Sequence, residues 1–438
     1  MDTKISKKTW SAIVVFGLFG QIAWAVENMY FNVFLYNEIG GTTDHIALMV
    51  AASAIVATVA TLLTGAYSDK INRRKVFISG GYILWGISTL VFAFISRANT
   101  AALFPSMQAQ KVLLLTVGAV VIMDCVMTFF GSSANDAAFN AWITDITVPK
   151  NRAGVEGVLS AMPLLAMLVV SGGFGMIIES VGYPMFFIIL GSTVSLSGLL
   201  GLLLIKESRS GIRSEEKYYK NIFYGFRPRV IAENKFLYIA LISIGAFGIS
   251  SQVFLPYLIV YLEKYLQFSV MEYSIVLAVA VLGAAIFGIL IGRLIDKKGK
   301  SKFVFISAFV YIIGLVLMFF ARSLYLLIAI GIVMMGGFVM LEIVLNSVIR
   351  DKTPKDKAGM FQGIRMIFFV LLPMVIGPYI GNGVINQSNQ TYLNEFGEIV
   401  KIPVPDIFLA AAKVALFMLI PLFILVLNIR KAENEEVK

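Results

Sequence analysis

Two reactive residue types are almost absent from this 438-residue chain, which contains one cysteine, Cys125, and one histidine, His45. A single cysteine excludes a disulfide within the chain. Because His45 lies in a short polar loop, we expect no Cys/His metal site, no Cys–His nucleophile and no Ser-His-Asp triad. A G-x-x-x-x-G-K-S/T phosphate loop is missing as well. The sequence therefore predicts neither an enzyme nor a nucleotide-driven pump, and no cofactor beyond a coupling ion.

Charged residues are also scarce, at 14% of the chain against about 25% in globular proteins. Hydrophobic residues reach 58%, and the mean hydropathy is +0.85. A soluble protein could not bury so much apolar surface, so we expect lipid around most of the chain. The net charge of +10 then reflects basic cytoplasmic loops, and no nucleic-acid partner is expected.

Twelve apolar stretches have the ~20 residues that a membrane-spanning helix needs. The alternation typical of barrel strands is absent from them, so the predicted fold class is all-α and integral to the membrane. The predicted spans are 10–37, 46–68, 76–96, 111–144, 153–178, 184–205, 236–264, 273–293, 303–321, 324–349, 358–383 and 406–429.

Lysine and arginine are distributed unevenly over the predicted loops. With the N-terminus in the cytoplasm, 29 of the 36 basic residues fall in cytoplasmic segments and five in outer loops. This asymmetry predicts a multi-pass protein of the plasma (inner) membrane with both termini cytoplasmic. Residues 206–235 are a long charged stretch, which we interpret as a cytoplasmic linker between an N-terminal six-helix bundle (1–205) and a C-terminal one (236–438).

The two halves resemble each other in sequence. Gly65 and Asp69, which precede basic residues after the second span, match Gly292 and Asp296 after the eighth. A second set of matches lies at and just after the ends of the fourth and tenth spans: Asn140, Asp145 and Thr147 correspond to Asn346, Asp351 and Thr353, and Asp136 corresponds to Glu342. Ordered matches at corresponding places in both halves indicate an internal repeat.

The run Gly65…Asp69…Arg73-Arg74 resembles the helix 2–3 signature of the major facilitator superfamily. In the C-terminal copy of this run, Gly299 stands at the second glycine of the signature. The resemblance covers the whole chain. It implies twelve helices in two pseudo-symmetric bundles, alternating access to a midplane site, and function as a monomer. It also implies a gating role for residues at the cytoplasmic helix ends: Gly65, Asp69, Arg73, Arg74, Asp145, Arg152, Gly292, Asp296, Arg350 and Asp351.

Two further segments are similar to the glycoside–pentoside–hexuronide cation symporters and their sucrose-type relatives. They are Arg350–Pro354 with the following Gly359 and Phe361–Arg365, and Trp24-Ala25-Val26-Glu27 on the first span. This resemblance implies symport of a sugar or glycoside with a proton or sodium ion. The chain departs from the melibiose branch, because 46–67 lacks an acid and Ile22 stands where a sugar-binding acid is expected.

Two acidic residues lie deep within predicted spans, where insertion costs at least ~2.5–3.5 kcal/mol. Glu27 is on the first span and Asp124 is in the middle of the fourth. We predict that they bind substrate or the coupling ion, and the alternative is a structural contact between helices. Asp136 lies deeper toward the cytoplasm and is interpreted as a gate or packing residue.

A further acid, Glu342, lies at the depth of Arg365 on the next span, and we predict a salt bridge or a substrate contact for this pair. Aromatic rings and amides suit the apolar faces and hydroxyls of a sugar. The candidates of that kind are Trp24, Asn28, Asn32, Trp142, Gln252, Tyr257, Tyr261 and Asn346.

Two other functions remain open from the sequence. The chain could export amphiphilic compounds in exchange for protons, or it could be a solute sensor that retains a transporter fold. A loaded ion gradient separates them, because a symporter accumulates solute, an exporter depletes it and a sensor moves none.

Overall fold

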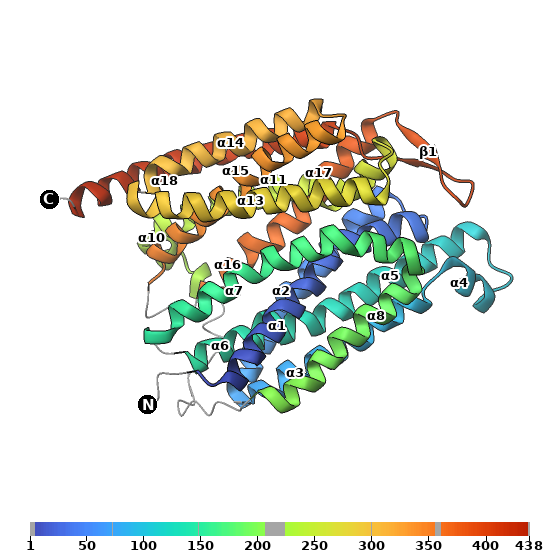
Figure 1. The fold of residues 1–438 in the computed structure, drawn as a ribbon, viewed down its shortest axis with the longest axis horizontal. Helices are drawn as coiled ribbons and strands as arrows, with labels where there is room; N and C mark the ends of the chain where they lie inside the picture. The colour runs from blue at the N-terminus through green and yellow to red at the C-terminus, as the bar shows by residue number, and fades with distance from the viewer. Residues whose placement is uncertain are drawn as a thin grey trace. The chain divides into compact units, whose positions relative to one another are not determined.

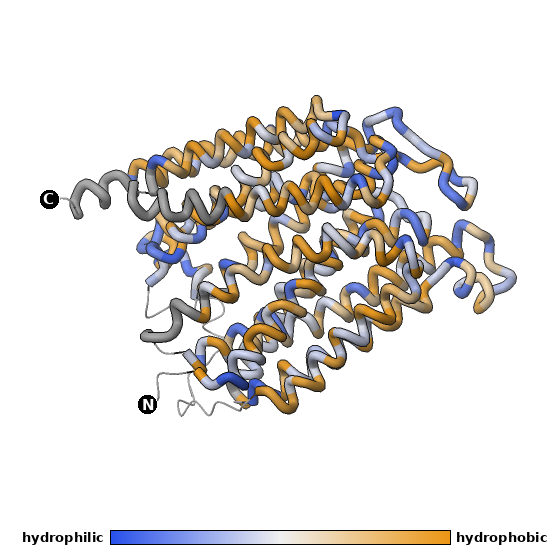
Figure 2. The backbone as a smooth tube through the Cα atoms, in the orientation of Figure 1, coloured by the Kyte–Doolittle hydropathy of each residue, from blue (hydrophilic) through white to orange (hydrophobic). Residues whose placement is uncertain are grey.

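The computed structural model describes residues 5–71, 73–147, 149–205, 224–298, 300–354 and 361–436. Helices account for nearly all of these residues (Figure 1). Hydrophobic residues run along the helices and hydrophilic ones gather at the helix ends and in the connecting loops (Figure 2). This distribution is expected of helices that satisfy their own backbone hydrogen bonds inside a lipid bilayer.

The helices confirm the predicted fold class. Within the described residues, ten helical stretches are long and apolar enough to cross a membrane, and a shorter apolar helix covers Val270–Ile286. One of the ten, Gly157–Leu204, contains two predicted spans. They are separated at Gly182, whose φ of 75° and ψ of 165° break the helix just before Pro184. Glycine is suited to this position because positive φ is costly for other residues.

The chain divides by its contacts into two compact units. Unit 1 comprises Met1–Tyr218 together with Asn394–Glu398, and unit 2 comprises Tyr219–Leu393 together with Ile399–Lys438. The short segment Asn394–Glu398 thus packs with unit 1, although both of its flanks belong to unit 2. Of the predicted linker, residues 206–223 lie outside the described part, and the remainder includes the short helix α10 (Pro228–Glu233).

Unit 1 is built from long apolar helices with short connections. Its α-helices are α1 (Lys7–Val26), α2 (Thr43–Ile71), α3 (Arg74–Val91), α4 (Arg97–Leu103), α5 (Ala109–Gly131), α6 (Asn140–Ile146), α7 (Pro149–Val169) and α8 (Gly175–Leu204).

Unit 2 has the same construction, with one small sheet added. Its α-helices are α10, α11 (Lys235–Phe254), α12 (Leu258–Val260), α13 (Val270–Lys298), α14 (Lys300–Phe320), α15 (Leu324–Lys352), α16 (Gln362–Met366), α17 (Leu372–Gln387) and α18 (Asp406–Glu436). Strands β1 (Thr391–Leu393) and β2 (Ile399–Lys401) form an antiparallel hairpin in which Tyr392 pairs with Val400.

Small residues allow α3 and α8 to pack closely in unit 1. A Cβ atom added to Gly86 would lie 2.2 Å from Ser195 Oγ and 2.4 Å from the Gly191 carbonyl oxygen. The reciprocal position, Gly191, would meet the Gly86 carbonyl oxygen at 2.6 Å. Close approach through small residues is a common way to hold membrane helices together, since burial of apolar surface gives little attraction there.

Several helices contain π-helical segments, which the sequence did not predict. They occur at Glu27–Phe31, Phe34–Glu38, Ser132–Phe139, Val170–Phe174, Tyr261–Tyr265 and Ile367–Leu371. Such segments are rare and often mark functional positions. Two of them contain the acidic residues Glu27 and Asp136.

Candidate functional site

Glu27 and Thr128 join the first and fourth predicted spans inside unit 1. Glu27 opens the π-helical segment that follows α1, and Thr128 lies on α5. The Thr128 hydroxyl donates a hydrogen bond of 2.9 Å to Glu27 Oε1. The Glu27 side chain is buried, and its second oxygen, Oε2, has no hydrogen-bond partner among the described residues.

Asp124 lies one helical turn before Thr128 and is 1% exposed. Ser53 of α2 is within hydrogen-bonding reach of its carboxylate, whereas Asp124 Oδ1 is buried without a partner in the described part of the chain. Asp124 and Glu27 are close enough for their negative charges to repel each other. The structure therefore brings together the two acids that the sequence analysis selected separately.

Among the described residues, this carboxylate pair has no basic side chain paired with it. No ion pair within the described ranges joins a lysine, arginine or histidine to Glu27 or Asp124. Two buried carboxylates without a cation are strongly unfavourable, and a proton or a metal cation relieves the repulsion. The arrangement can therefore take up and release a cation, with Thr128 and Ser53 as further oxygen ligands or hydrogen-bond partners.

Asp136 extends the polar region along the same helix. It lies in the π-helical segment Ser132–Phe139, accepts a hydrogen bond of 3.4 Å from Asn135 Nδ2 and interacts electrostatically with Glu27. Asn135 Oδ1 in turn accepts a hydrogen bond from the Tyr82 hydroxyl at 3.0 Å. Asp136 thus belongs to a polar network within unit 1 and is not an isolated packing residue.

The aromatic and amide candidates of the first span take different positions. Trp24 packs against Trp85 of α3, with ring centroids 4.8 Å apart. Asn32 is buried and donates to the Asn28 carbonyl oxygen at 2.9 Å, and the exposed Asn28 donates to the Trp24 carbonyl oxygen at 2.8 Å. These bonds within the helix leave the Asn32 amide oxygen buried without a partner among the described residues.

Several other sugar-site candidates are in contact with neighbouring protein groups. Tyr257 is fully buried and donates to the Pro378 carbonyl oxygen at 2.8 Å. Tyr261 stacks on Tyr265, and Trp142 stacks on Phe139. Gln252 and Asn346, by contrast, are partly exposed within unit 2.

The predicted salt bridge between Glu342 and Arg365 is wrong. The ion pairs of the described residues do not include it, and the Arg365 guanidinium lies over the Phe369 ring, 5.2 Å from its centroid. Two residues at equal depth on neighbouring spans need not point toward each other. Here Arg365 instead makes a cation–π contact with a ring one turn along its own helix.

The residues of unit 1 that the sequence analysis predicted to act in gating form one clear contact. Arg74 is buried, and its Nε donates to Asp145 Oδ2 at 3.1 Å while Nη1 donates to Ser68 Oγ at 2.6 Å. Arg73 is exposed. Gly65 lies in α2, and Arg350 and Asp351 lie at the end of α15. The side chains of Asp69, Arg152 and Asp296, and the surroundings of Gly292, lie outside the described part.

The Arg74–Asp145 contact yields a stability prediction. Arg74→Gln leaves Asp145 without its cation, so we expect a lower melting temperature in detergent, with a cost approaching the about 3–5 kcal/mol of a broken buried pair. Arg73→Gln, at the exposed neighbouring position, is the control and should melt like the parent protein. Equal melting temperatures for Arg74→Gln and Arg73→Gln would contradict a stabilising contact.

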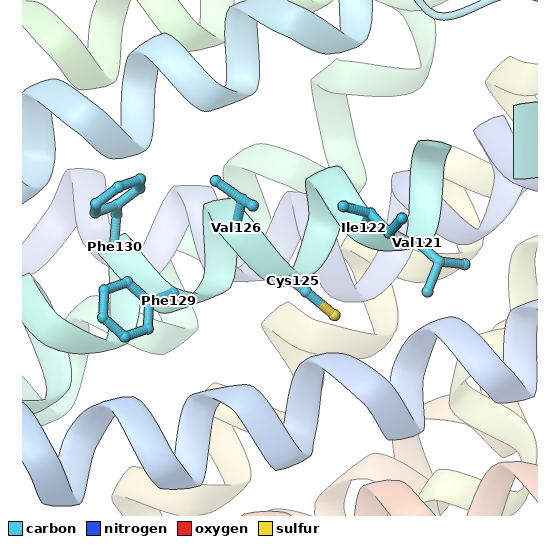
Figure 3. A pocket seen from close by; sticks show the side chains of 6 residues that line it. All are labelled: Val121, Ile122, Cys125, Val126, Phe129 and Phe130. Atoms are coloured by element: carbon cyan, nitrogen blue, oxygen red, sulfur yellow. The ribbon is translucent and has the colours of Figure 1, made fainter. Parts of the chain in front are cut away.

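A separate apolar pocket lies on another face of α5. Figure 3 shows its six lining side chains, Val121, Ile122, Cys125, Val126, Phe129 and Phe130. Its volume is about 360 Å³. No charged side chain lines it, so it can accept only an apolar group.

The long apolar helices are those of a multi-pass membrane protein. The sequence matches the Major Facilitator Superfamily over residues 11–378 and again over residues 240–438. The chain therefore belongs to this superfamily, and it is a secondary transporter rather than an enzyme. No curated protein sequence matches it significantly.

Solved structures of transporters have the same fold. A mutant of the nucleoside transporter NupG superposes with a TM-score of 0.69 at 14% identity, covering 96% of this chain and 100% of that one. A bacterial homologue of the human lysosomal transporter Spinster, inward-facing and unoccupied, gives 0.65 at 15% identity and 98% coverage of both chains. NupG itself gives 0.65 at 13% identity, covering 96% and 98%.

Sequence reasoning missed the hydroxyl partners of the two acids. Neither Thr128 nor Ser53 was selected from the sequence as a partner of Glu27 or Asp124. A serine or threonine within a membrane span usually bonds to its own helix, as Ser53 also does to the Val50 carbonyl oxygen at 3.1 Å. The sequence therefore carries no signal that separates such residues from those at a site.

Proposed function

We propose that the protein is an ion-gradient-driven symporter of a small polar solute, a sugar or glycoside, and that Glu27 and Asp124 bind the coupling proton or sodium ion. The observation that carries this proposal is the buried carboxylate pair with two unpartnered oxygens and no basic residue paired to it in the described part of unit 1. Ionisable groups that are this costly inside a membrane are usually functional.

The groups around this pair favour a hydroxylated solute. Asn28 and Asn32 follow Glu27 on the same helix, and Trp24 precedes it by one turn. Amides can donate to and accept from sugar hydroxyls, and indole rings stack on apolar sugar faces. A nucleoside is an N-glycoside and NupG is a nucleoside transporter, so nucleosides are included in the panel to be tested.

Alternating access follows as part of the same proposal. The two units would expose the solute to the two sides of the membrane in turn, with both termini in the cytoplasm and one chain as the functional unit. Arg74 and Asp145 would hold the helix ends of unit 1 together at the cytoplasmic side, as the resemblance to the superfamily signature implies.

A counterflow experiment in proteoliposomes tests the proposal. Vesicles loaded with a panel of monosaccharides, glycosides and nucleosides are diluted into trace labelled solute, and the hits are then assayed under proton and sodium gradients. We expect at least one hydroxylated solute to exchange and to accumulate with one of the two gradients. Exchange of none of them, or export driven by the inward ion gradient, would overturn the proposal.

An exporter of amphiphilic compounds is the second candidate, and the apolar pocket on α5 favours it. The pocket could take an aliphatic or aromatic group while Asp124, on the neighbouring face, binds a proton. Phe129→Ser would then raise the KM for amphiphiles and leave sugar counterflow unchanged. A protein that binds solutes without moving any of them would instead be a sensor.

A further inference from the structure

The polar network around Asp136 in unit 1 has one hydrogen too few for its acceptors. The Tyr82 hydroxyl on α3 lies 2.7 Å from the Phe16 carbonyl oxygen of α1 and 3.0 Å from Asn135 Oδ1. A hydroxyl carries a single hydrogen, and both of these neighbours are acceptors. Only one of the two contacts can therefore be a full hydrogen bond at any moment.

Burial leaves little room for solvent to supply the missing hydrogen. Tyr82 is fully buried and Asn135 is 4% exposed. A Cβ atom added to Gly20 would lie 2.4 Å from Tyr82 Oη and 2.7 Å from Asn135 Oδ1, so the backbone of α1 closes the network on that side. An acceptor without a donor is costly in such a place, and the network should favour any arrangement that supplies one.

The other end of the network is the Asp136 carboxylate. Asn135 Nδ2 donates to Asp136 Oδ1 at 3.4 Å, and donor groups of Ser132 and Trp24 also face this carboxylate. Donors that surround a carboxylate stabilise its ionised form. The arrangement in the structure therefore suits a charged Asp136, while it leaves the Tyr82 end of the network one hydrogen short.

Rotation of the Asn135 amide by half a turn about its last side-chain bond, a torsion with two broad minima, gives a second arrangement. The amide nitrogen then donates to Tyr82 Oη, and the Tyr82 hydrogen is free for the Phe16 carbonyl oxygen. The amide oxygen now faces Asp136, where two acceptors meet unless Asp136 carries a proton. With that proton, the Asp136 hydroxyl donates to Asn135 Oδ1 and every acceptor in the chain has its own donor.

The charged and titratable groups around Asp136 allow it to exchange a proton. Among the described residues, Glu27 and Tyr82 interact electrostatically with Asp136, and Asp124 of α5 acts in turn on Glu27. From α2, the uncharged Thr64 hydroxyl contacts the same π-helical segment. A proton on Asp136 removes its repulsion of Glu27 and so favours a charged Glu27. The two acids therefore tend to hold one proton between them.

The remaining charged pair nearby is already compensated. Arg74 of α3 and Asp145 of α6 bind each other at 3.1 Å. Neither of them needs a proton or a further partner from the network. The charge state of the network is therefore decided by its acids, Asp136 and Glu27.

We propose that Asp136 is a proton-binding residue of unit 1, and that rotation of the Asn135 amide transmits its protonation to Tyr82 and to the Phe16 carbonyl group of α1. A sodium ion cannot take the place of this proton, because only a protonated carboxyl group can donate to the amide oxygen. Binding of the proton is a property of the network alone. Its part in coupling rests on the proposed function, in which the partly exposed Asp136 passes the proton to or from the buried Glu27.

Infrared difference spectra of the purified protein, recorded between alkaline and acidic buffer without any solute, test the proposal. Protonation of Asp136 adds the carbonyl stretch of a carboxylic acid, and Asp136→Asn should lose this component. The same spectra should show a shift in the C–O stretch of one tyrosine, which Tyr82→Phe removes. Asn135→Leu should keep a carboxylic-acid band but lose the tyrosine shift, because leucine has no donor and acceptor to exchange between the two groups.

The matched control is Tyr311→Phe in unit 2. Tyr311 is also fully buried, but the side chain within reach of its hydroxyl is a serine, with Ser250 Oγ at 3.2 Å. This variant should keep both the Asp136 band and the tyrosine shift that Tyr82→Phe removes. Loss of that shift in Tyr311→Phe would assign it to the wrong tyrosine and would contradict the link to Asp136.

Three results would overturn the proposal: a carboxylic-acid band in Asp136→Asn equal to that of the parent protein, a tyrosine shift that survives in Asn135→Leu, or loss of the Asp136 band when sodium is added at constant pH. If Asp136→Asn does not fold, the tyrosine shift in the parent protein, Tyr82→Phe and Asn135→Leu decides. A network that titrates as expected in a protein that transports none of the panel solutes would overturn only the proposed function.

Discussion

Glu27→Gln is expected to abolish accumulation of solute against its gradient while solute exchange continues. The glutamine oxygen can still accept the hydrogen bond that Thr128 donates to Glu27 Oε1, so packing around α5 is preserved. The amide cannot bind or release a proton, and it binds a metal cation far more weakly than a carboxylate does. The accumulation ratio should therefore fall to the value of passive equilibration.

Asp124→Asn tests the second member of the carboxylate pair in the same assay. If the two acids share one cation, each single variant should uncouple transport and the double variant should be no worse, because both changes act on one site. Glu233→Gln is the control, since Glu233 is exposed and pairs with Arg229 on α10. Full ion-driven accumulation in both single variants would make the pair structural and would direct the search to Asp136 or Glu342.

Gly86→Ala and Gly80→Ala, on the same helix, should change stability in opposite directions. The new methyl group at position 86 would lie 2.2–2.4 Å from atoms of α8, so α3 and α8 must separate. Overpacking of this kind typically costs 1–3 kcal/mol. At position 80 a Cβ atom meets nothing within 4 Å, and replacing a helical glycine by alanine stabilises by roughly 0.5–1 kcal/mol.

The measurement is the melting temperature of the purified protein in detergent. Gly86→Ala should melt below the parent protein and Gly80→Ala at or above it. If Gly86→Ala melts at the temperature of the parent protein, α3 and α8 do not pack as closely as the structure has them.

The spans could be predicted from the sequence because the hydropathies of neighbouring residues simply add up along a span. Each span needs only a sufficient run of apolar residues, and the fifth and sixth spans could be told apart although Gly182 and Pro184 lie between two apolar runs. The π-helical segment at Glu27–Phe31 could not be predicted in this way, because one extra residue per turn depends on tertiary contacts and leaves the average hydropathy unchanged.

Some candidate residues could be predicted from the sequence and others could not, for a physical reason. Glu27 and Asp124 were found because a carboxylate inside a membrane is costly whatever its neighbours are. The direction in which a side chain points could not be predicted from the sequence, as the stacking of Arg365 on Phe369 shows.

Asn394–Glu398 lies in the C-terminal half of the sequence but belongs to unit 1. This limits how the gene can be divided into two separately expressed halves. A fragment that ends in the linker would lack the five residues Asn394–Glu398, which otherwise belong to its unit. The two halves would then have to be expressed together, with the C-terminal fragment supplying part of the N-terminal unit. Although the halves repeat each other in sequence, this segment makes them unequal, so an N-terminal half taken from a homologous protein would still need five residues from the C-terminal half to be complete.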